Sequence, residues 1–343
     1  MRKMYCIISY SDYCTSWFEE VIKDKDIVMI EDFYHTERNF MRFHRFLSRV
    51  EAHFNIFGLP GQLKQRIEEY ALFRKLRSCG LDQDCEVIFL FFELSFACFS
   101  YQLQRKLKQR FSNSKNCFMF TNVDKGIRTV ENKLKLFKSE YCAIMTYDAN
   151  MANKYGFVHL NIPYSTVGFN NDISLYTSDV FFCGVDKGRT EKLIEIFNHL
   201  RAKSLRCVFW IRGDCPPDFD ESQADGLIFI HNKIDYCVIR KAIMHTRCIL
   251  EVINNQDATY AESYTVRVQE AIAYEKKLIS NCHGITDKSF YNINQFLIFD
   301  AVDDIHTEFV LNESTQGYTE RNYFSPRKFL TQIDMILAKN DAT

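Results

Sequence analysis

Two glutamates eight residues apart, Glu262 and Glu270, lie at the ends of the segment whose residue types are best suited to binding a ligand. Thr265 and Arg267 lie between them, and the apolar spacing that follows favours a helix starting at Thr265. A carboxylate can accept hydrogen bonds from two sugar hydroxyls, whereas arginine and the first N–H groups of a helix favour phosphate. We therefore expect this segment, with Tyr264 at the helix start, to bind a ligand that carries both a sugar and phosphates.

A simpler interpretation of the same residues stays open. Thr265 can serve only as the cap of the helix, and Arg267 with Glu270 can form an exposed ion pair one turn apart. The sequence alone does not choose between a ligand site and an ordinary helix start.

A second candidate phosphate site follows an apolar strand that ends near Gly184. The next residues include Lys187 and Arg189, and a helix with an apolar stripe comes after them. Two cations beside the free N–H groups of a helix start suit a diphosphate, although the pattern is also that of a tight turn with exposed basic residues. The loop is neither a P-loop nor a G-x-G-x-x-G fingerprint, which argues against a nicotinamide-dependent oxidoreductase.

A framework of parallel strands is needed to hold both segments. Short apolar runs alternate with amphipathic segments, which predicts β-α-β units. We expect strands at residues 4–9, 27–30, 87–92, 117–121, 142–146, 159–162, 180–183, 207–211, 226–230, 248–252, 278–280 and 296–299. We expect helices at residues 44–57, 62–77, 95–111, 128–137, 188–203, 234–245, 265–274 and 326–338.

The polar stretch 163–178 predicts a linker between two domains, which is also the number expected for 343 residues. The predicted fold class is α/β, with two Rossmann-like parallel-sheet domains. We place an N-terminal domain at 1–165, a C-terminal domain at 166–325, and a final helix at 326–343 that packs back towards the first domain. Parallel sheets bind ligands at the carboxyl ends of their strands, so both candidate segments are suitably placed.

The composition limits the classes of function. A net charge of −1 gives no reason to expect nucleic acid as a partner. Residues 101–150 nevertheless carry ten Lys and Arg against four Asp and Glu, which fits either solvated helix faces or a surface for an anionic membrane or a lipid-linked phosphate. The thirteen cysteines form no C-x-x-C pair, and the first ten residues do not read as a signal peptide. We therefore expect no metal site and a cytoplasmic location, with contact at the inner face of the cell membrane if the basic surface binds lipid.

The string Glu262-Ser-Tyr-Thr-Val-Arg-Val-Gln-Glu270 resembles the E-x7-E region of GT-B glycosyltransferases. Residues 147–156, 179–193, 248–251 and 265–280 are similar to bacterial enzymes that build lipopolysaccharide or capsule chains. The resemblance covers residues 142–340 by motif, and residues 1–140 only by architecture. It implies the GT-B architecture and transfer of a sugar from a nucleoside-diphosphate sugar, with UDP as the expected carrier, to a growing glycan such as lipopolysaccharide, O-antigen or capsule.

The resemblance also implies roles for particular residues. Lys187 and Arg189, in a loop that begins at Gly184, would neutralise the departing nucleoside diphosphate, a role that needs no metal or other cofactor. Glu270 would hold the ribose. The base would lie near Tyr236, after the predicted strand 226–230.

Three carboxylates are candidate catalytic groups. Asp12 and Glu93 follow the first and third predicted strands, where a general base would stand if the reaction inverts the anomeric centre. Glu262 is the third candidate, and a retaining reaction would need no such base. The chain lacks the Gly-rich turn of the family after its first strand, and residues 257–262 lack the usual glycines. A non-catalytic partner subunit of a polysaccharide assembly complex, or a nucleotide-sugar epimerase of the same fold, are the alternatives.

Overall fold

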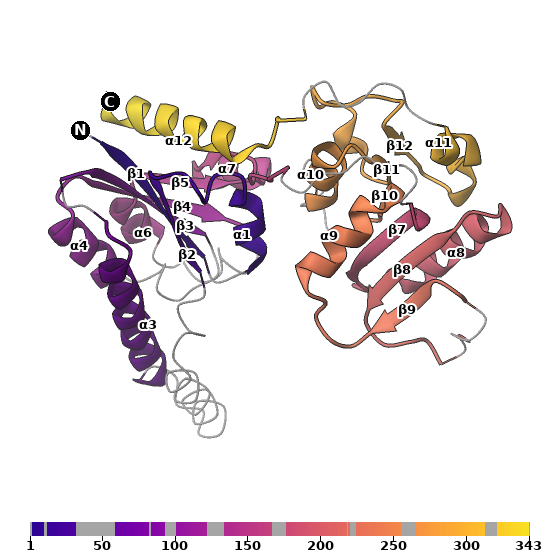
Figure 1. Ribbon diagram of the computed structural model, residues 1–343, viewed down its shortest axis with the longest axis horizontal. Helices are drawn as coiled ribbons and strands as arrows, with labels where there is room; N and C mark the ends of the chain where they lie inside the picture. Colours follow the sequence, from indigo (N-terminus) through magenta and orange to yellow (C-terminus); the bar gives the residue numbers. More distant parts are fainter. Residues whose placement is uncertain are drawn as a thin grey trace. The chain divides into compact units, whose positions relative to one another are not determined.

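The computed structural model of the protein describes residues 2–9, 12–31, 59–81, 84–92, 101–121, 134–166, 176–217, 219, 224–254, 265–312 and 321–342. The chain forms two compact units, one of Met1–Ser165 with Pro326–Thr343 and one of Thr166–Ser325 (Figure 1). Each unit contains a six-stranded sheet in which every pairing is parallel. The predicted α/β class with two Rossmann-like domains is confirmed.

The sheet of the first unit has the order β2-β1-β3-β4-β5-β6. Because β2 pairs on one side of β1 and β3 on the other, the strand order reverses between β1 and β3. The elements are β1 (Lys3–Ser9), α1 (Asp12–Phe18), β2 (Ile27–Glu31), α3 (Leu59–Ser78), β3 (Glu86–Phe92), α4 (Tyr101–Arg110), β4 (Ser114–Phe120), α6 (Leu134–Glu140), β5 (Ala143–Thr146), α7 (Ala149–Tyr155), β6 (Val158–His159) and α12 (Pro326–Asp341).

Helix α12 completes the first unit although it follows the whole second unit in the chain. The Phe329 ring packs edge-on against Phe18, with 5.8 Å between the ring centroids, and also contacts Phe92 of β3. At the surface, Arg327 forms an ion pair with Asp24 at 2.8 Å. Aromatic packing and an ion pair therefore both fix α12 on this sheet.

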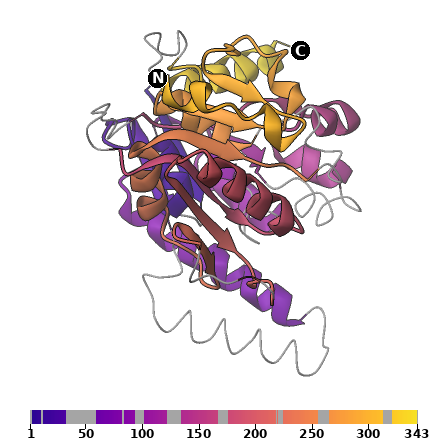
Figure 2. The ribbon, with the colours of Figure 1, turned by 90° about the vertical axis from the view of Figure 1, so that its right-hand side faces the viewer.

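The sheet of the second unit has the order β12-β11-β10-β7-β8-β9, which reverses between β7 and β10. Helix α8 lies on one face of this sheet (Figure 2). It buries four apolar residues in the core of the unit. The elements are β7 (Ser178–Val185), α8 (Thr190–Ala202), β8 (Cys207–Arg212), β9 (Leu227–Ile230), α9 (Tyr236–Met244), β10 (Thr246–Glu251), α10 (Val266–Ala273), β11 (Lys277–Ser280), η6 (His283–Ile285), β12 (Phe296–Ile298), η7 (Val302–Asp304) and α11 (Thr307–Leu311).

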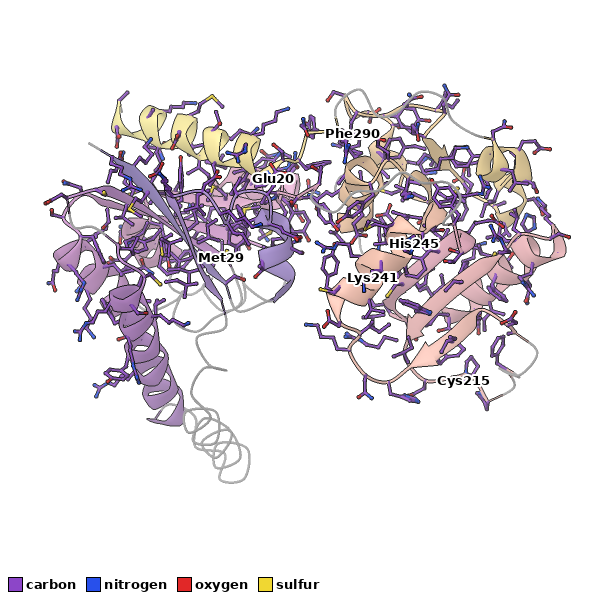
Figure 3. The ribbon with its side chains drawn as sticks, viewed as in Figure 1. Glu20, Met29, Cys215, Lys241, His245 and Phe290 are labelled. Carbon is purple, nitrogen blue, oxygen red and sulfur yellow. The ribbon has the colours of Figure 1, made fainter. Side chains whose placement is uncertain are left out.

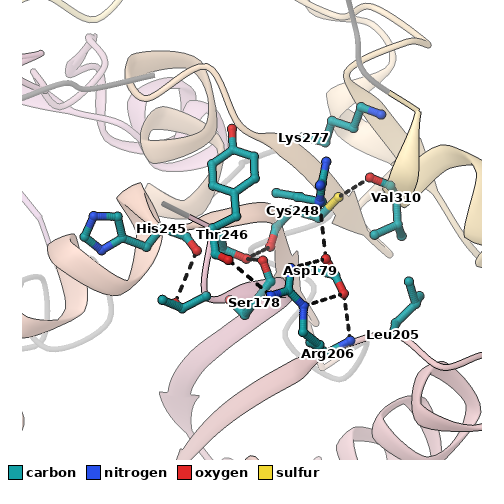
Figure 4. A network of polar contacts seen from close by, with 12 residues as sticks. Ser178, Asp179, Leu205, Arg206, His245, Thr246, Cys248, Lys277 and Val310 are labelled. Atoms are coloured by element: carbon teal, nitrogen blue, oxygen red, sulfur yellow. Dashed lines mark hydrogen bonds and ion pairs between the residues drawn. The ribbon is translucent and has the colours of Figure 1, made fainter. Parts of the chain in front are cut away.

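A buried acid anchors the amino end of β7 (Figure 4). The Asp179 carboxylate accepts hydrogen bonds from the Arg206 side chain, at 3.1 and 3.3 Å, and from the Arg206 backbone N–H at 2.8 Å. Arg247 contacts the same carboxylate at 3.2 Å. The strand that begins the second sheet is therefore fixed at the end opposite to the candidate site.

The chain segments that border the two units are held by contacts within each unit. On the side of the first unit, the Glu20 N–H donates to the Ser165 hydroxyl at 3.1 Å. On the side of the second unit, the ring of Phe290, which Figure 3 labels, packs against those of Tyr323 and Phe324.

Every predicted strand is present, but some bounds differ. The strand expected at 159–162 is only Val158–His159, and Pro163, which has no N–H to donate, follows soon after. Residue Ser178, expected in the linker, starts β7 because its N–H bonds to the His245 carbonyl. Helices α1, α7 and α11 were not predicted, and the helix expected at 44–57 lies outside the described residues. Among the helices of the described ranges, none has the length and apolar character needed to cross a membrane.

Candidate functional site

The second sheet brings the two candidate segments together at the point where its strand order reverses. β7 pairs with β10 in parallel, so their carboxyl ends lie at one edge of the sheet. In open α/β sheets, ligands bind outside the carboxyl ends of the strands at such a point. The Asn254 amide, in the loop after β10, donates to the Lys187 carbonyl in the loop after β7 at 3.0 Å. The topology therefore joins residues that are 67 positions apart in the sequence.

The loop after β7 is closed by its own acid, Asp186. The Asp186 carboxylate accepts hydrogen bonds from the Arg189 N–H at 3.1 Å and from the Thr190 N–H at 2.9 Å, and the Thr190 hydroxyl also donates to it. Burial opposes ionisation of this carboxyl group, but these hydrogen bonds outweigh burial and lower its pKa. The N–H groups that we expected to be free for a phosphate at the start of α8 are therefore bonded to Asp186.

The Arg189 side chain links the two strand ends. Its guanidinium donates to the Val252 carbonyl, after β10, and to the Val185 carbonyl at 2.8 Å. It also lies over the Phe182 ring, 5.3 Å from the centroid. A side chain at Gly184 would place its Cβ 2.8 Å from the guanidinium, so any larger residue there would displace the end of the Arg189 side chain. Lys187, in contrast, is exposed and has a left-handed backbone with φ of 49°.

Glu270 lies at the centre of a buried polar cluster. Its side chain is fully buried, Tyr236 donates its hydroxyl to Oε1 at 3.2 Å, and Arg267 donates to Oε2. The guanidinium of Arg267 also donates to the Cys183 carbonyl, in β7, at 2.8 Å. Burial raises the pKa of Glu270, although the Arg267 charge and the hydrogen bonds from Arg267 and Tyr236 oppose this. The Arg267–Glu270 pair is therefore interior, not the exposed surface pair that the simpler interpretation gave.

Thr265 caps α10, as the simpler interpretation of the sequence predicted. Its hydroxyl accepts from the Arg267 N–H at 3.1 Å and donates to the carboxylate of Glu251. Glu251 is the last residue of β10 and is 3% exposed. The sequence analysis assigned no role to Glu251 or to Asp186. The sequence did carry a signal for each. Glu251 is an acid within an apolar strand, and Asp186 is an acid just before a predicted helix.

The remaining candidates are only partly described. Glu262 and Tyr264 lie outside the described residues. Asp12 is the first residue of α1, soon after β1, and Glu93 directly follows β3 but is itself outside the described ranges. Because the first sheet reverses its order between β1 and β3, both positions follow the strands that flank the reversal. Within the described ranges, no three His, Cys, Asp or Glu residues gather as a metal site would require.

Comparison with known proteins gives likeness in structure only. No protein-family model matches the chain, and no curated protein matches its sequence. A UDP-forming α,α-trehalose-phosphate synthase from Burkholderia xenovorans superposes with a TM-score of 0.53 at 10% identity, over 100% of both chains. An α-glucosyltransferase solved with UDP and DNA has a TM-score of 0.51 at 11% identity, over 77% of this chain and 82% of that one.

A third similar structure, TarM, has a TM-score of 0.47 at 10% identity over 80% of this chain, which spans 58% of its length. With two six-stranded parallel sheets and the two neighbours whose TM-scores exceed 0.5, the fold of the chain is that of the GT-B glycosyltransferases.

Proposed function

We propose that this protein is a glycosyltransferase that moves a sugar from a nucleoside-diphosphate sugar to a growing glycan. The observation that carries the proposal is the meeting of Arg189, Arg267 and Glu270 at the strand-order reversal of the second sheet. Such an edge is the usual ligand position of an open α/β sheet. Of the two superposed structures with a TM-score above 0.5, one is called UDP-forming and the other was solved with UDP. These names support UDP as the carrier.

The basic side chains at this edge of the sheet would stabilise the nucleoside diphosphate as it leaves the sugar. A sugar leaves a nucleoside diphosphate more easily when positive charge stabilises the developing negative charge on the phosphate oxygens. Lys187 is exposed in the loop after β7, Arg189 donates to the Val252 carbonyl after β10, and Arg267 donates to the Cys183 carbonyl in β7. We assign the diphosphate to these residues and propose that no metal is required.

Glu270 and Tyr236 are assigned to the nucleoside. The two ribose hydroxyls can donate to the Glu270 carboxylate, provided that they replace the hydroxyl of Tyr236, which now donates to it. Tyr236 would then be released towards the base. Thr265 keeps its role as the cap of α10.

The acceptor is assigned to the first unit. We propose a surface glycan, such as lipopolysaccharide, O-antigen or capsule, with Asp12 or Glu93 as the base if the reaction inverts configuration. Arg105 and Lys106 of α4 have side chains that are 66% and 52% exposed, which suits contact with an anionic membrane or a lipid-linked phosphate. Both also form ion pairs, with the buried acids Glu140 and Glu69, so they add less to this surface than their number suggests.

A thermal-shift panel tests the proposal. UDP, GDP, CDP, TDP, CMP and NAD are each added at millimolar concentration, with and without Mg²⁺. A ligand at 100 times its dissociation constant adds about 2.7 kcal/mol, which raises the melting temperature by a few degrees. We expect one nucleoside diphosphate to raise the melting temperature equally with and without Mg²⁺, and Glu270→Ala to remove that rise. No rise with any nucleotide would reject the proposal.

A non-catalytic partner subunit is the second candidate. The observation that favours it is the enclosure of Glu270, both of whose carboxylate oxygens are already bonded within the chain. If no nucleotide raises the melting temperature, the carboxylate of Glu270 serves only the fold. The non-catalytic subunit then replaces the glycosyltransferase as the proposed function.

A further inference from the structure

Glu251 receives hydrogen bonds from two different elements at the end of β10. Thr265, the cap of α10, donates its hydroxyl to Oε1, and Ser280, the last residue of β11, donates its hydroxyl to Oε2. The Glu251 side chain is almost fully buried, and so is Ser280. One carboxylate therefore joins β10, α10 and β11 at the edge where the proposed site lies.

Each of the two hydroxyls also accepts a hydrogen bond from a backbone N–H. Thr265 accepts from Arg267 at 3.1 Å, and Ser280 accepts from Cys282 at 3.0 Å. A hydroxyl has a single proton, so donating it to the carboxylate turns the oxygen lone pairs towards the N–H group. Burial raises the pKa of Glu251, although the hydrogen bonds from Ser280 and Thr265 oppose this. In its ionised form the carboxylate can only accept, and it then fixes both hydroxyls in this direction.

The start of α10 determines where the Arg267 guanidinium lies. That guanidinium spans from Glu270, one turn along α10, to the Cys183 carbonyl in β7, and it does so only if α10 begins in its present place. A displaced cap would move the backbone of Arg267 and with it both of these contacts.

We propose that Glu251 is a positioning residue of the donor site, which acts through Thr265 to hold Arg267 where it meets the diphosphate. This inference rests on the proposed function. Glu251 touches no ligand in this scheme, and its effect should fall on the phosphates, which Arg267 serves, and not on the nucleoside.

Glu251→Gln is the informative change because it keeps the size of the side chain. Its NH2 group cannot accept a hydroxyl proton, so one of the two hydroxyls loses its charged acceptor and must turn its proton away from position 251. The NH2 group then donates to that hydroxyl oxygen and competes with the backbone N–H for its lone pairs. Thr265→Val removes the same link from the other side at nearly the same volume. Thr265→Ser keeps the hydroxyl and is the matched control.

The first measurement is amide hydrogen exchange by NMR in the absence of ligand. We expect the Arg267 and Cys282 amides together to report the change, with at least one of them exchanging about tenfold faster in Glu251→Gln, as the loss of one hydrogen bond to a charged group predicts. The Arg267 amide should exchange faster in Thr265→Val and remain as in the wild type in Thr265→Ser. Unchanged exchange of both amides in Glu251→Gln would overturn the positioning role.

The second measurement compares the affinities for UDP and uridine by calorimetry. We expect Glu251→Gln to bind UDP about tenfold more weakly than the wild type and to bind uridine with the same affinity as the wild type. The double variant Glu251→Gln with Thr265→Val should bind UDP as tightly as Thr265→Val alone, because both changes break the same link. Equal losses for both ligands would mean a purely structural role and would also overturn the inference. If the wild type binds no nucleoside diphosphate, the proposed function fails. The role of Glu251 in holding α10 is tested separately, because the amide exchange of the variants is measured without a ligand.

Discussion

The guanidinium of Arg189 donates a hydrogen bond to the carbonyl of Val252, 63 residues further along the chain. This contact ties the loop after β7 to the loop after β10, the two strands between which the sheet reverses its order. A residue that sequence analysis chose for its charge thus also holds the backbone of the proposed site in place.

Arg189→Ala should therefore weaken both the fold and ligand binding. We expect a loss of about 2 kcal/mol in the free energy of unfolding, because two carbonyls lose a charged donor, and about tenfold weaker UDP binding. Urea unfolding and calorimetry measure the two effects. Lys192→Ala on the surface of α8 is the control and should change neither by more than about 0.5 kcal/mol. Wild-type affinity in Arg189→Ala would remove this residue from the donor site.

The positions of the strands along the chain could be predicted because buried parallel strands appear as continuous apolar runs. β3 and β7 are examples, and each begins within two residues of the position expected from the sequence. The short helices α1 and α7 were missed because seven residues carry too little periodicity to be distinguished from a turn.

The candidate site was predictable only as a set of segments. The likeness of residues 262–270 to a known motif selected Arg267 and Glu270, but it said nothing of their burial. Asp186 and Glu251 were missed because the structural role of a carboxylate depends on which groups donate hydrogen bonds to it. Those partners are brought together by the loop geometry in one case and by three neighbouring elements in the other.

The stability of the protein should depend on the ionisation of Glu270. Burial raises its pKa above the ordinary value of 4.5, so above pH 4.5 the folded chain keeps a proton that the unfolded chain has lost. The free energy of unfolding must then fall as pH rises from 4.5 through the raised pKa. Subtracting the curve of Glu270→Gln from that of the wild type isolates this slope. A difference that is flat or rises with pH would contradict the burial of an ionisable group here.

Asp179→Asn should destabilise the second unit without changing its ligand affinity. Asp179 lies at the amino end of β7, away from the proposed site, and its loss leaves Arg247 without a carboxylate partner among the described residues. We expect a cost of about 2 kcal/mol, less than for a wholly buried pair because the Arg206 side chain is 54% exposed.

The cost of Asp179→Asn should itself depend on pH. Burial opposes ionisation of Asp179, but its hydrogen bonds to Arg206 outweigh burial and lower the pKa. Its stabilising effect is therefore complete above the ordinary value of 3.8 and is lost as pH falls through the lowered pKa. Urea unfolding at pH 7 and pH 3 measures the difference, and UDP affinity at pH 7 serves as the control. Weaker UDP binding at pH 7 would show that the two ends of β7 are coupled.

Gly226→Ala should disrupt the pairing of β8 with β9. The new Cβ would lie 2.1 Å from the Cys207 carbonyl oxygen, in a backbone with φ of +98°. We expect a loss of about 3 kcal/mol or more in the free energy of unfolding, from strain and overpacking together. Gly80→Ala, at φ of +65° with open space around it, is the matched control and should cost about 1 kcal/mol. Equal losses in the two variants would argue against the close approach at Gly226.

The return of α12 to the first sheet makes the second unit an insertion within the first. During synthesis on the ribosome, residues 166–325 emerge complete while the first unit still lacks the helix whose Phe329 packs on Phe18 and Phe92. The second unit can therefore fold first although it comes later in the gene. The first sheet must wait, with that apolar surface uncovered, until the last helix is translated, and this interval is when the nascent chain most needs protection by chaperones.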